Sequence, residues 1–280
     1  MYPQKLELDA RHSYFTDDDC FTAAPWHLVH AYDHENYKFK MHAHAFYEMN
    51  IITAGEGRHY IEESALNVQV GDVFVLPPKV SHGYFAKDTL DICHVLLRED
   101  FLTRYRAELS ALPGFALLFD IEPQIRLASG QGFQLRIAPQ LLPEIRAAAA
   151  EIMAAEQEGE YALQCALTLG FIGRLGRLLQ KRVSSEENPL QRGELLRVMA
   201  HVQENLDRHL SLAELAAVAN VSAPTLNRYF REILHTSPMQ YVLQCRLTRA
   251  RELLAQHTQS KTEIAAACGF YDVAHMNKYL

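Results

Sequence analysis

The chain has 280 residues, of which 49% are apolar and 22% are charged. This composition is ordinary for a globular protein of about two domains, and it excludes a fibrous or largely disordered chain. The formal net charge of -7 is unevenly distributed, because residues 189–280 contain 10 Lys and Arg against 8 Asp and Glu, and the remainder contains 17 against 26. This asymmetry suits a C-terminal part that binds DNA and an acidic N-terminal part.

Signals for targeting and for disulfides are absent from the sequence pattern. No apolar run approaches the roughly 20 residues that cross a bilayer, and residues 1–14 lack the apolar segment of a signal peptide. The five cysteines are scattered without a CxxC pair, which favours small buried side chains over disulfides or zinc ligands. We therefore expect a cytoplasmic protein without a membrane partner.

The N-terminal third predicts a short arm followed by a β-rich domain. Residues 1–20 are polar and end in three aspartates, Asp17 to Asp19, which predicts a mobile arm. Short runs rich in Val, Ile, Phe and Tyr then alternate with Gly, Asn, Asp and Pro, as in a small β-barrel or sandwich. The predicted strands cover residues 26–32, 46–53, 58–61, 72–76 and 92–97.

Histidines and one glutamate gather in this β-rich part. His42 and His44 lie two residues apart and share one face of a strand, Glu48 lies an even number of residues beyond them, and a facing strand can bring up His82. Three imidazoles and a carboxylate inside a barrel suit a divalent Zn, Ni, Mn or Fe ion. The alternative is a cavity that binds an organic effector without a metal. For His59 and His94, parity alone leaves both faces open.

Two further residues are candidates for contact with an effector. Lys79 lies near the mouth implied by the Pro77-Pro78 turn, where its charge disfavours a cation and favours an anionic or polyhydroxylated ligand. Trp26, the only tryptophan, either offers a wall for a sugar ring or belongs to the core. The expected effector site thus consists of Trp26, His42, His44, Glu48, Lys79 and His82.

The periodicity becomes helical in the middle of the chain. Residues 141–158 and 161–182 predict two helices, and glycine recurs in the second at positions 170, 173 and 176. Each glycine costs a helix about 1 kcal/mol relative to alanine, which a close approach between helices would explain. That approach is either a dimer contact or packing against the barrel.

A polar linker, residues 184–189, precedes two stretches that repeat one pattern. Ser211–Val221 and Ser260–Phe270 each open with Ser-x-x-Glu, the signature of a capping box at a helix start. Asn220 in the first copy and Gly269 in the second are residue types that end a helix sharply in the left-handed conformation.

A second helix is predicted after each turn. Ser222 and Asp272 are its expected N-caps, and the small Ala216 and Ala265 allow it to cross closely over the first helix. Each repeat therefore predicts a helix-turn-helix unit. Residues 237–254 predict one long helix between the units, and such a spacer can hold two reading helices about one DNA turn, ~34 Å, apart.

These features together resemble the AraC/XylS family of bacterial transcription regulators. The spacing of the histidines matches the two cupin motifs over residues 37–86, although Asn36 and Lys79 stand where those motifs usually have glycine. The most specific likeness lies in residues 195–270. It includes Leu226-Asn-Arg228-x-Phe230, Ser237-Pro238-x-x-Tyr241, Arg246-x-x-x-Ala250-x-x-Leu253-Leu254 and Ile264-Ala265-x3-Gly269-Phe270.

The resemblance implies an α+β multidomain fold. Residues 1–135 would form a cupin-like effector-binding domain with an N-terminal arm, residues 136–188 a helical linker and dimerisation region, and residues 189–280 an all-α domain with two helix-turn-helix units. We expect the second unit to be truncated, because the family continues beyond the position of Leu280.

The resemblance also implies partners. It implies a homodimer that binds double-stranded DNA, responds to a sugar or related small metabolite, and contacts RNA polymerase if it is an activator. This role requires no cofactor and no catalytic residue, apart from the divalent metal that the barrel could hold.

The DNA contacts follow by position, because the second helix of each unit enters a major groove in such regulators. In the first unit Pro224, Asn227 and Arg228 would face bases, since asparagine suits adenine and arginine suits guanine. Arg231 lies on the same helix, and it suits phosphates together with three arginines of the spacer helix, Arg246, Arg249 and Arg251. The corresponding residues of the second unit are Val273, Ala274, His275, Asn277 and Lys278.

Two other functions are compatible with these residues. One is a metal-dependent cupin enzyme, an isomerase or oxygenase with a helical appendage, whose ligands are His42, His44, Glu48 and His82. The other is an adaptor whose degenerate second unit no longer binds DNA. We expect the regulator, and loss of DNA binding on substitution of Arg228 would distinguish it from both.

Overall fold

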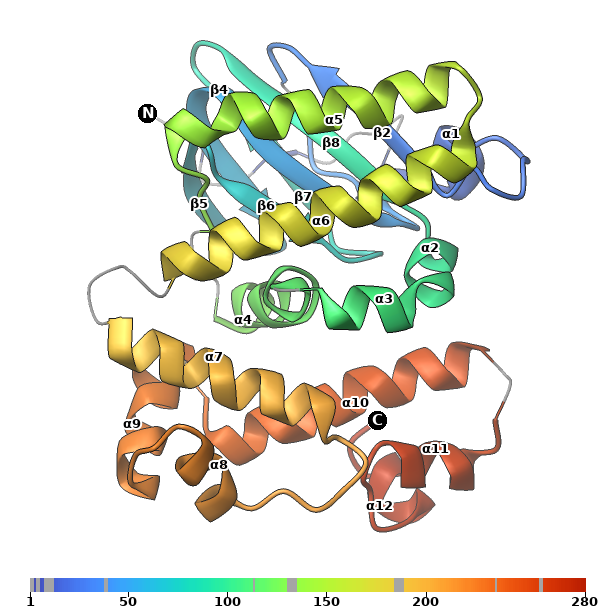
Figure 1. Cartoon of the computed structure of the whole chain (residues 1–280). Helices are drawn as coiled ribbons and strands as arrows, with labels where there is room; N and C mark the ends of the chain where they lie inside the picture. The colour runs from blue at the N-terminus through green and yellow to red at the C-terminus, as the bar shows by residue number, and fades with distance from the viewer. Residues whose placement is uncertain are drawn as a thin grey trace. The chain divides into compact units, whose positions relative to one another are not determined.

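The computed structural model describes residues 3, 6–7, 13–37, 40–112, 114–129, 135–183, 189–234, 236–256 and 259–280. The chain divides into two compact units, Met1–Val183 and Ser184–Leu280 (Figure 1). The first combines sheets with helices and the second is helical. The predicted α+β fold with an all-α C-terminal domain is thereby confirmed. The predicted linker lies outside the described residues, except for Pro189.

The first unit is built around one long strand, β4 (Tyr47–Ile61). Its first half pairs with β8 (Leu90–Leu97) and β6 (Val73–Leu76), and β2 (Val29–His34) pairs with β8. Its second half pairs with β5 (Ser64–Gln69) and β7 (His82–Phe85). The pairing with β8 has a register shift between Ile52 and Ala54 and ends at Gly55, and the pairing with β5 begins at Glu56. Residues 46–53 and 58–61, predicted as two strands, therefore belong to one strand that serves both layers of the barrel.

The segment before β2 is an ordered edge of the barrel. Strand β1 (Tyr14–Phe15) pairs in parallel with β3 (Ala43–His44), and α1 (Asp17–Cys20) follows it. The ring of Phe15 meets the ring of His42 edge to face at 5.5 Å. Residues 13–20 therefore differ from the mobile arm that their polarity predicts, because they add a strand beside His44.

Helices cover one layer of the barrel and continue its chain. Helices α5 (Leu142–Gln157) and α6 (Tyr161–Val183) lie side by side and pack on β2 (Figure 1). Both agree with the predicted helical periodicity. The shorter elements between β8 and α5 are α2 (Glu99–Arg104), α3 (Arg106–Ala111), a π-helical turn (Leu117–Ile121), α4 (Glu122–Ser129) and a 3-10 turn (Pro139–Leu141).

The glycines of α6 have two different environments. A Cβ on Gly173 would meet the side chain of Leu112 at 3.1 Å, and the backbone of Gly176 lies against Gly114. A Cβ on Gly170 would meet no atom within 4 Å. The absence of a side chain at Gly173 and at Gly114 therefore allows close packing within residues 1–183, whereas Gly170 faces outward.

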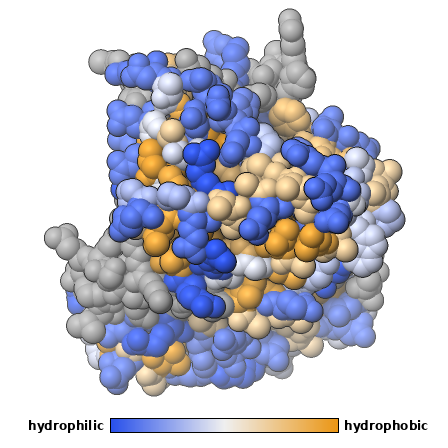
Figure 2. Space-filling view, turned by 45° about the horizontal axis from the view of Figure 1, so that its top comes forward, coloured by the Kyte–Doolittle hydropathy of each residue, from blue (hydrophilic) through white to orange (hydrophobic). Residues whose placement is uncertain are grey.

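Helix α6 also contains a long apolar stretch. By length and composition Tyr161–Leu179 could cross a membrane, with a mean hydropathy of 1.2, which differs from the expectation that no apolar run is long enough. Half of this stretch is buried within the unit. On the face that Figure 2 shows, apolar residues are interspersed with hydrophilic ones. A core helix passes the same test of length and composition, so a single helix of this kind is weak evidence for a membrane span.

The second unit contains both predicted helix-turn-helix pairs. Its helices are α7 (Pro189–Glu204), α8 (Leu212–Val218), α9 (Ala223–Leu234), α10 (Pro238–Gln256), α11 (Lys261–Ala267) and α12 (Val273–Asn277). The turns between α8 and α9 and between α11 and α12 have left-handed residues, Asn220 with a φ of 56° and Gly269 with a φ of 69°. Ala216 and Ala265 are buried where the paired helices meet, as predicted.

The predicted N-caps hold these helices at their first turns. Ser260 and Glu263 form a complete capping box, and Asp272 accepts the amide of His275 at 2.7 Å. Ser211 accepts the amide of Glu214, but the Glu214 carboxylate does not reach back to the cap. It instead binds His201 at 2.9 Å and Arg208 at 2.5 Å, so it joins α8 to α7 and to the loop that follows α7.

Candidate effector cluster and DNA-binding surface

Five side chains converge inside the barrel from different elements. Glu48 of β4 is 3% exposed, and its carboxylate is surrounded by imidazoles. The Nε2 atoms of His44 and His82 lie 3.1 Å and 2.9 Å from its Oε2, and His94 Nδ1 lies 2.7 Å from its Oε1. His42 completes the group, because its ligating nitrogen lies within 4.8 Å of those of Glu48 and His82. The predicted set of three histidines and one carboxylate is therefore brought together.

Backbone carbonyls fix the orientation of three of these rings. The Nδ1 atoms of His42, His44 and His82 each face a carbonyl oxygen, which only accepts, so each Nδ1 carries the proton. The acceptors are Lys40 at 3.0 Å, Phe46 at 2.6 Å and Val80 at 3.3 Å. In the neutral ring Nε2 then presents a lone pair. The Nε2 atoms of His44 and His82 make no hydrogen bond in the described part of the chain, although both lie beside Glu48.

The charges of the cluster are unbalanced. Burial lowers the pKa of His42 to about 4, with a contribution from His82, and burial also lowers the pKa of His82. Burial opposes ionisation of Glu48, but the neighbouring histidines, His82 foremost, hold its pKa well below the ordinary value. An ionised Glu48 beside neutral rings, with a ring N–H donated to it by His94, leaves a buried negative charge that no positive charge among the described rings balances, which is costly. A cation between these atoms would remove that cost.

The residues present therefore fit a divalent metal ion. Imidazole nitrogens with one carboxylate oxygen are ligands for Zn, Ni, Mn or Fe(II). Metal-bound histidines usually donate the other ring N–H to a carbonyl or carboxylate, and three rings here already do so. His94 is an additional member, because its ring stacks on Tyr32 at 4.7 Å and donates to Glu48.

A second polar group lines the same interior. His59 faces inward and is fully buried, and its ring stacks on Tyr84 at 4.0 Å. Asn50 donates to the Tyr84 hydroxyl at 3.1 Å. Both ring nitrogens of His59 and the side-chain oxygen of Asn50 lack a hydrogen-bond partner in the part of the chain that the structure describes. Buried polar atoms of this kind mark the place of water or a polar ligand.

Two expected effector contacts lie apart from the cluster. Trp26 is 50% exposed, and the Arg104 guanidinium lies 4.3 Å from its ring centre. The side chain of Lys79 is exposed, while its amide donates to the carbonyl of His44 at 2.8 Å. Lys79 has a φ of 69° and Asn36 a φ of 53°, so both positions require the left-handed backbone that glycine adopts most easily. This explains the glycine of the usual motif.

Another histidine cluster near the surface is explained by hydrogen bonds alone. Glu156 of α5 binds His27 at 2.8 Å and His30 at 2.6 Å, and it accepts from Gln164 of α6 at 3.0 Å. The amide of Thr22 donates to Nδ1 of His27, so Nε2 carries the proton that Glu156 accepts. That protonated nitrogen is not a metal ligand, and the cluster instead ties α5 and α6 to β2.

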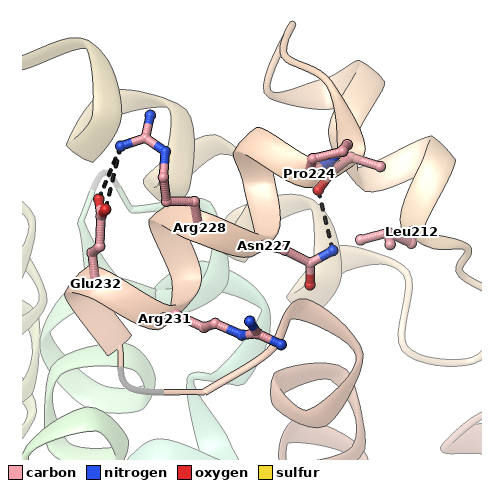
Figure 3. A pocket seen from close by; sticks show the side chains of 7 residues that line it. Leu212, Pro224, Asn227, Arg228, Arg231 and Glu232 are labelled. Carbon is pink, nitrogen blue, oxygen red and sulfur yellow. Dashed lines mark hydrogen bonds and ion pairs between the residues drawn. The ribbon is translucent and has the colours of Figure 1, made fainter.

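The first helix-turn-helix unit presents a hollow along α9. The hollow has a volume of about 730 Å³ and is lined by Leu212, Ala223, Pro224, Asn227, Arg228, Arg231 and Glu232 (Figure 3). Leu226 and Phe230 on the opposite face of α9 are fully buried, which leaves the polar side chains directed outward. All four residues predicted to contact DNA in this unit line the hollow.

Polar contacts orient the side chains of this surface. Asn227 Nδ2 donates to the carbonyl of Ala223 at 3.2 Å. Arg228 Nη1 lies 3.2 Å from a carboxylate oxygen of Glu232, one helical turn further along. Arg231 is exposed and makes no ion pair with any described residue. A guanidinium, an amide and a second guanidinium thus line one hollow beside α9.

The second helix-turn-helix unit, α11 and α12, exposes most of the corresponding residues of its second helix. Met276 of α12 is fully buried, whereas Leu280 is 41% exposed. Val273 is half-buried against the core. The remaining predicted contacts are exposed, namely Ala274, His275, Asn277 and Lys278.

Arg246 does not belong to a phosphate-binding set. Its Nε donates to the carbonyl of Leu206 at 3.2 Å and its Nη2 to the carbonyl of Arg208 at 2.7 Å. Burial lowers the pKa of Arg246. The guanidinium also lies against Gly269, so it joins the loop between α7 and α8 to the turn between α11 and α12. The periodicity of α10 could not reveal this inward direction.

Comparisons with known proteins agree with this architecture. Residues 26–169 match the AraC-like ligand binding domain, and residues 215–280 match a helix-turn-helix domain. The transcriptional activator RhaS of Klebsiella pneumoniae is 26% identical over 239 residues, which are 85% of this chain and 82% of RhaS. The transcriptional regulator GbdR of Pseudomonas aeruginosa is 43% identical over 84 residues, which are 30% of this chain and only 23% of GbdR.

A solved AraC-type regulator from Chromobacterium violaceum is 34% identical, with a TM-score of 0.31, over 33% of this chain and 82% of that one. The ligand-binding match alone spans more than half of the 280 residues. The chain therefore belongs to the AraC family of transcription regulators.

Proposed function

We propose that the chain regulates transcription by sequence-specific binding to double-stranded DNA, in response to a small molecule bound in the barrel. The observation that carries this proposal is the α9 surface, where Asn227, Arg228 and Arg231 line one hollow on the second helix of a helix-turn-helix unit. In such units the second helix lies in the major groove and its N-terminal residues reach base edges.

Each side chain of the surface has a chemical role in this proposal. Arg228 pairs with O6 and N7 of a guanine, Asn227 with N6 and N7 of an adenine, and Arg231 with a phosphate. Pro224 packs on the base edges near the start of α9. The second unit adds weaker contacts through α12, with Val273, Ala274, His275, Asn277 and Lys278.

The effector in this proposal is a sugar or a related small metabolite. The buried polar atoms around Asn50 and His59 support a ligand that has several hydroxyl or carbonyl groups. We further infer that His42, His44, Glu48 and His82 hold a divalent metal ion. The ion would supply positive charge and coordination positions for oxygen atoms of the effector. The same residues without a metal would bind the effector by hydrogen bonds.

The proposed assembly is a homodimer in the cytoplasm. Residues 1–135 would bind the effector, residues 136–188 would form the dimer, and residues 189–280 would bind DNA. The 48% exposed Leu163 and the outward Gly170 of α6 support a contact between copies along this helix. Contact with RNA polymerase follows if the protein is an activator.

The DNA-binding proposal is tested by selection from a randomised duplex library at about 0.15 M salt, where nonspecific phosphate contacts are weak. The wild type should enrich a limited set of sequences, and Arg228→Ala should abolish that enrichment. Arg197→Ala is the matched control, because it removes the same charge from the exposed surface of α7. Equal enrichment by Arg228→Ala and the wild type would refute the assignment.

The metal proposal is tested by elemental analysis of protein purified without chelators. We expect about one divalent ion per chain, lost in Glu48→Gln and in His82→Ala and retained in the exposed control His209→Ala. Circular dichroism of each variant would establish that the barrel is folded. A wild-type protein that remains metal-free after incubation with Zn, Ni, Mn and Fe(II) would favour the metal-free effector cavity.

A further inference from the structure

Glu232 is the only carboxylate among the described residues that line the α9 hollow. Both of its oxygens lie near Arg228 Nη1, at 3.3 Å and 3.2 Å. The two side chains are about half exposed, at 53% and 50%. Figure 3 shows the pair at one end of the hollow, with Asn227 toward the other end. The recognition surface therefore carries an acid beside the arginine that is proposed to bind guanine.

This acid opposes binding to DNA that lacks the right sequence. In the free protein it occupies Arg228, and near a phosphate its charge is repelled. An exposed ion pair of this kind contributes little free energy. A well-placed contact between Arg228 and a base can therefore replace it, whereas a mobile contact with a phosphate gives a smaller gain in free energy. The carboxylate thus penalises nonspecific complexes more than specific ones.

The chemistry of the major groove limits which bases can donate a hydrogen bond to Glu232. Guanine O6 and N7, thymine O4 and the phosphates are all acceptors, and they repel a carboxylate. Adenine offers an amino group beside the acceptor N7, while cytosine offers its N4 amino group without an adjacent acceptor. Cytosine is therefore the favoured base for this side chain.

We propose that Glu232 is a specificity-determining residue, which holds Arg228 away from phosphates and selects a cytosine next to the guanine that Arg228 contacts. This inference rests on the proposed DNA binding by α9. Because Glu232 lies one turn after Arg228 on the same side of the helix, both side chains reach neighbouring base pairs on one edge of the groove.

The test compares Glu232→Ala with the matched control Glu204→Ala, which removes the same charge from an exposed position at the end of α7. Selection from a randomised duplex library by each protein gives the base preference at every position. The wild type and Glu204→Ala should prefer cytosine beside the selected guanine by roughly 5- to 150-fold. In Glu232→Ala this preference should fall close to one, while the guanine remains selected.

Binding to a duplex without the selected site provides an independent readout. Glu232→Ala should bind it about fivefold more tightly than the wild type, and the slope of log K against log salt should steepen by about 0.9, because Arg228 gains one phosphate. In an Arg228→Ala background, Glu232→Ala should no longer steepen the slope relative to Glu204→Ala, because the arginine that gains the phosphate is absent.

The failures are distinguishable. A wild type that selects no sequence would overturn the proposed function. Identical base preferences for Glu232→Ala and the wild type would overturn the role of Glu232 alone, as would a salt slope that matches the Glu204→Ala control.

Discussion

Gly269 in the turn of the second helix-turn-helix unit should be intolerant of any side chain. Its φ of 69° costs an alanine about 1 to 2 kcal/mol. A Cβ there would also overlap the carbonyl oxygen of Leu206 and lie 2.7 Å from Nη2 of Arg246. Relief of this overlap requires loss of at least one hydrogen bond from Arg246, which adds about 1 to 3 kcal/mol. Gly269→Ala should therefore lower the free energy of unfolding of the C-terminal unit, Ser184–Leu280, by about 3 kcal/mol.

Two other glycines separate these contributions. Gly159 has a φ of 75°, but a Cβ there would meet nothing within 4 Å, so Gly159→Ala should cost only about 1 to 2 kcal/mol. Gly170 lies within α6 with neither constraint, and Gly170→Ala should stabilise the first unit by up to about 1 kcal/mol. Urea denaturation of the full chain, followed by circular dichroism, measures all three. A Gly269→Ala cost no larger than that of Gly159→Ala would refute the steric reasoning.

Three further predictions concern the polar clusters. Glu156→Gln should lower the free energy of unfolding of the first unit by about 2 kcal/mol at neutral pH, because it weakens charged hydrogen bonds to both histidines. Hydrogen bonds from His30 and the Ala31 amide outweigh burial and lower the folded-state pKa of Glu156 below 4.5. The contribution of Glu156 to stability is therefore present above its unfolded-state pKa and is lost as the pH falls through its folded-state pKa. In urea denaturation, the free energies of unfolding of the variant and the wild type should thus converge in acid. A difference that does not change with pH would contradict this. Arg246→Met should destabilise the second unit by about 2 kcal/mol in the same assay and leave the salt slope of DNA binding unchanged; a shallower slope would restore its phosphate role. Addition of a chelator should lower the melting temperature of the wild type and leave that of His82→Ala unaffected, as measured by calorimetry; equal shifts would contradict a metal at this cluster.

The sequence is most informative where structure depends on neighbouring residues. The caps at Ser260 and Asp272 and the left-handed turns at Asn220 and Gly269 are confirmed, because each depends on the chemistry of a few adjacent positions. The capping box at Ser211 is only half correct. The Glu214 carboxylate has a stronger alternative in Arg208 and His201, whose proximity depends on how α7 packs.

Contacts between distant segments could not be predicted in the same way. The inward direction of His94 depends on its pairing with Asn50 across β8 and β4. Parity cannot establish this pairing, because the register is a property of two strands. Trp26 lies at the surface beside Arg104, although its size suggests the core or an effector wall. Four members of the cluster around Glu48 could be found in advance, because His42, His44, Glu48 and His82 follow even spacing along the chain and a family motif.

The proposed function depends on recognition of a DNA sequence by α9 through Arg228. The most direct test is selection of sheared genomic DNA on the purified full chain at about 0.15 M salt, followed by sequencing, for the wild type, Arg228→Ala and Arg197→Ala. A few strongly enriched sites with a shared sequence are expected for the wild type and Arg197→Ala, and none for Arg228→Ala. Enrichment that is absent from all three, or unchanged in Arg228→Ala, would contradict this expectation.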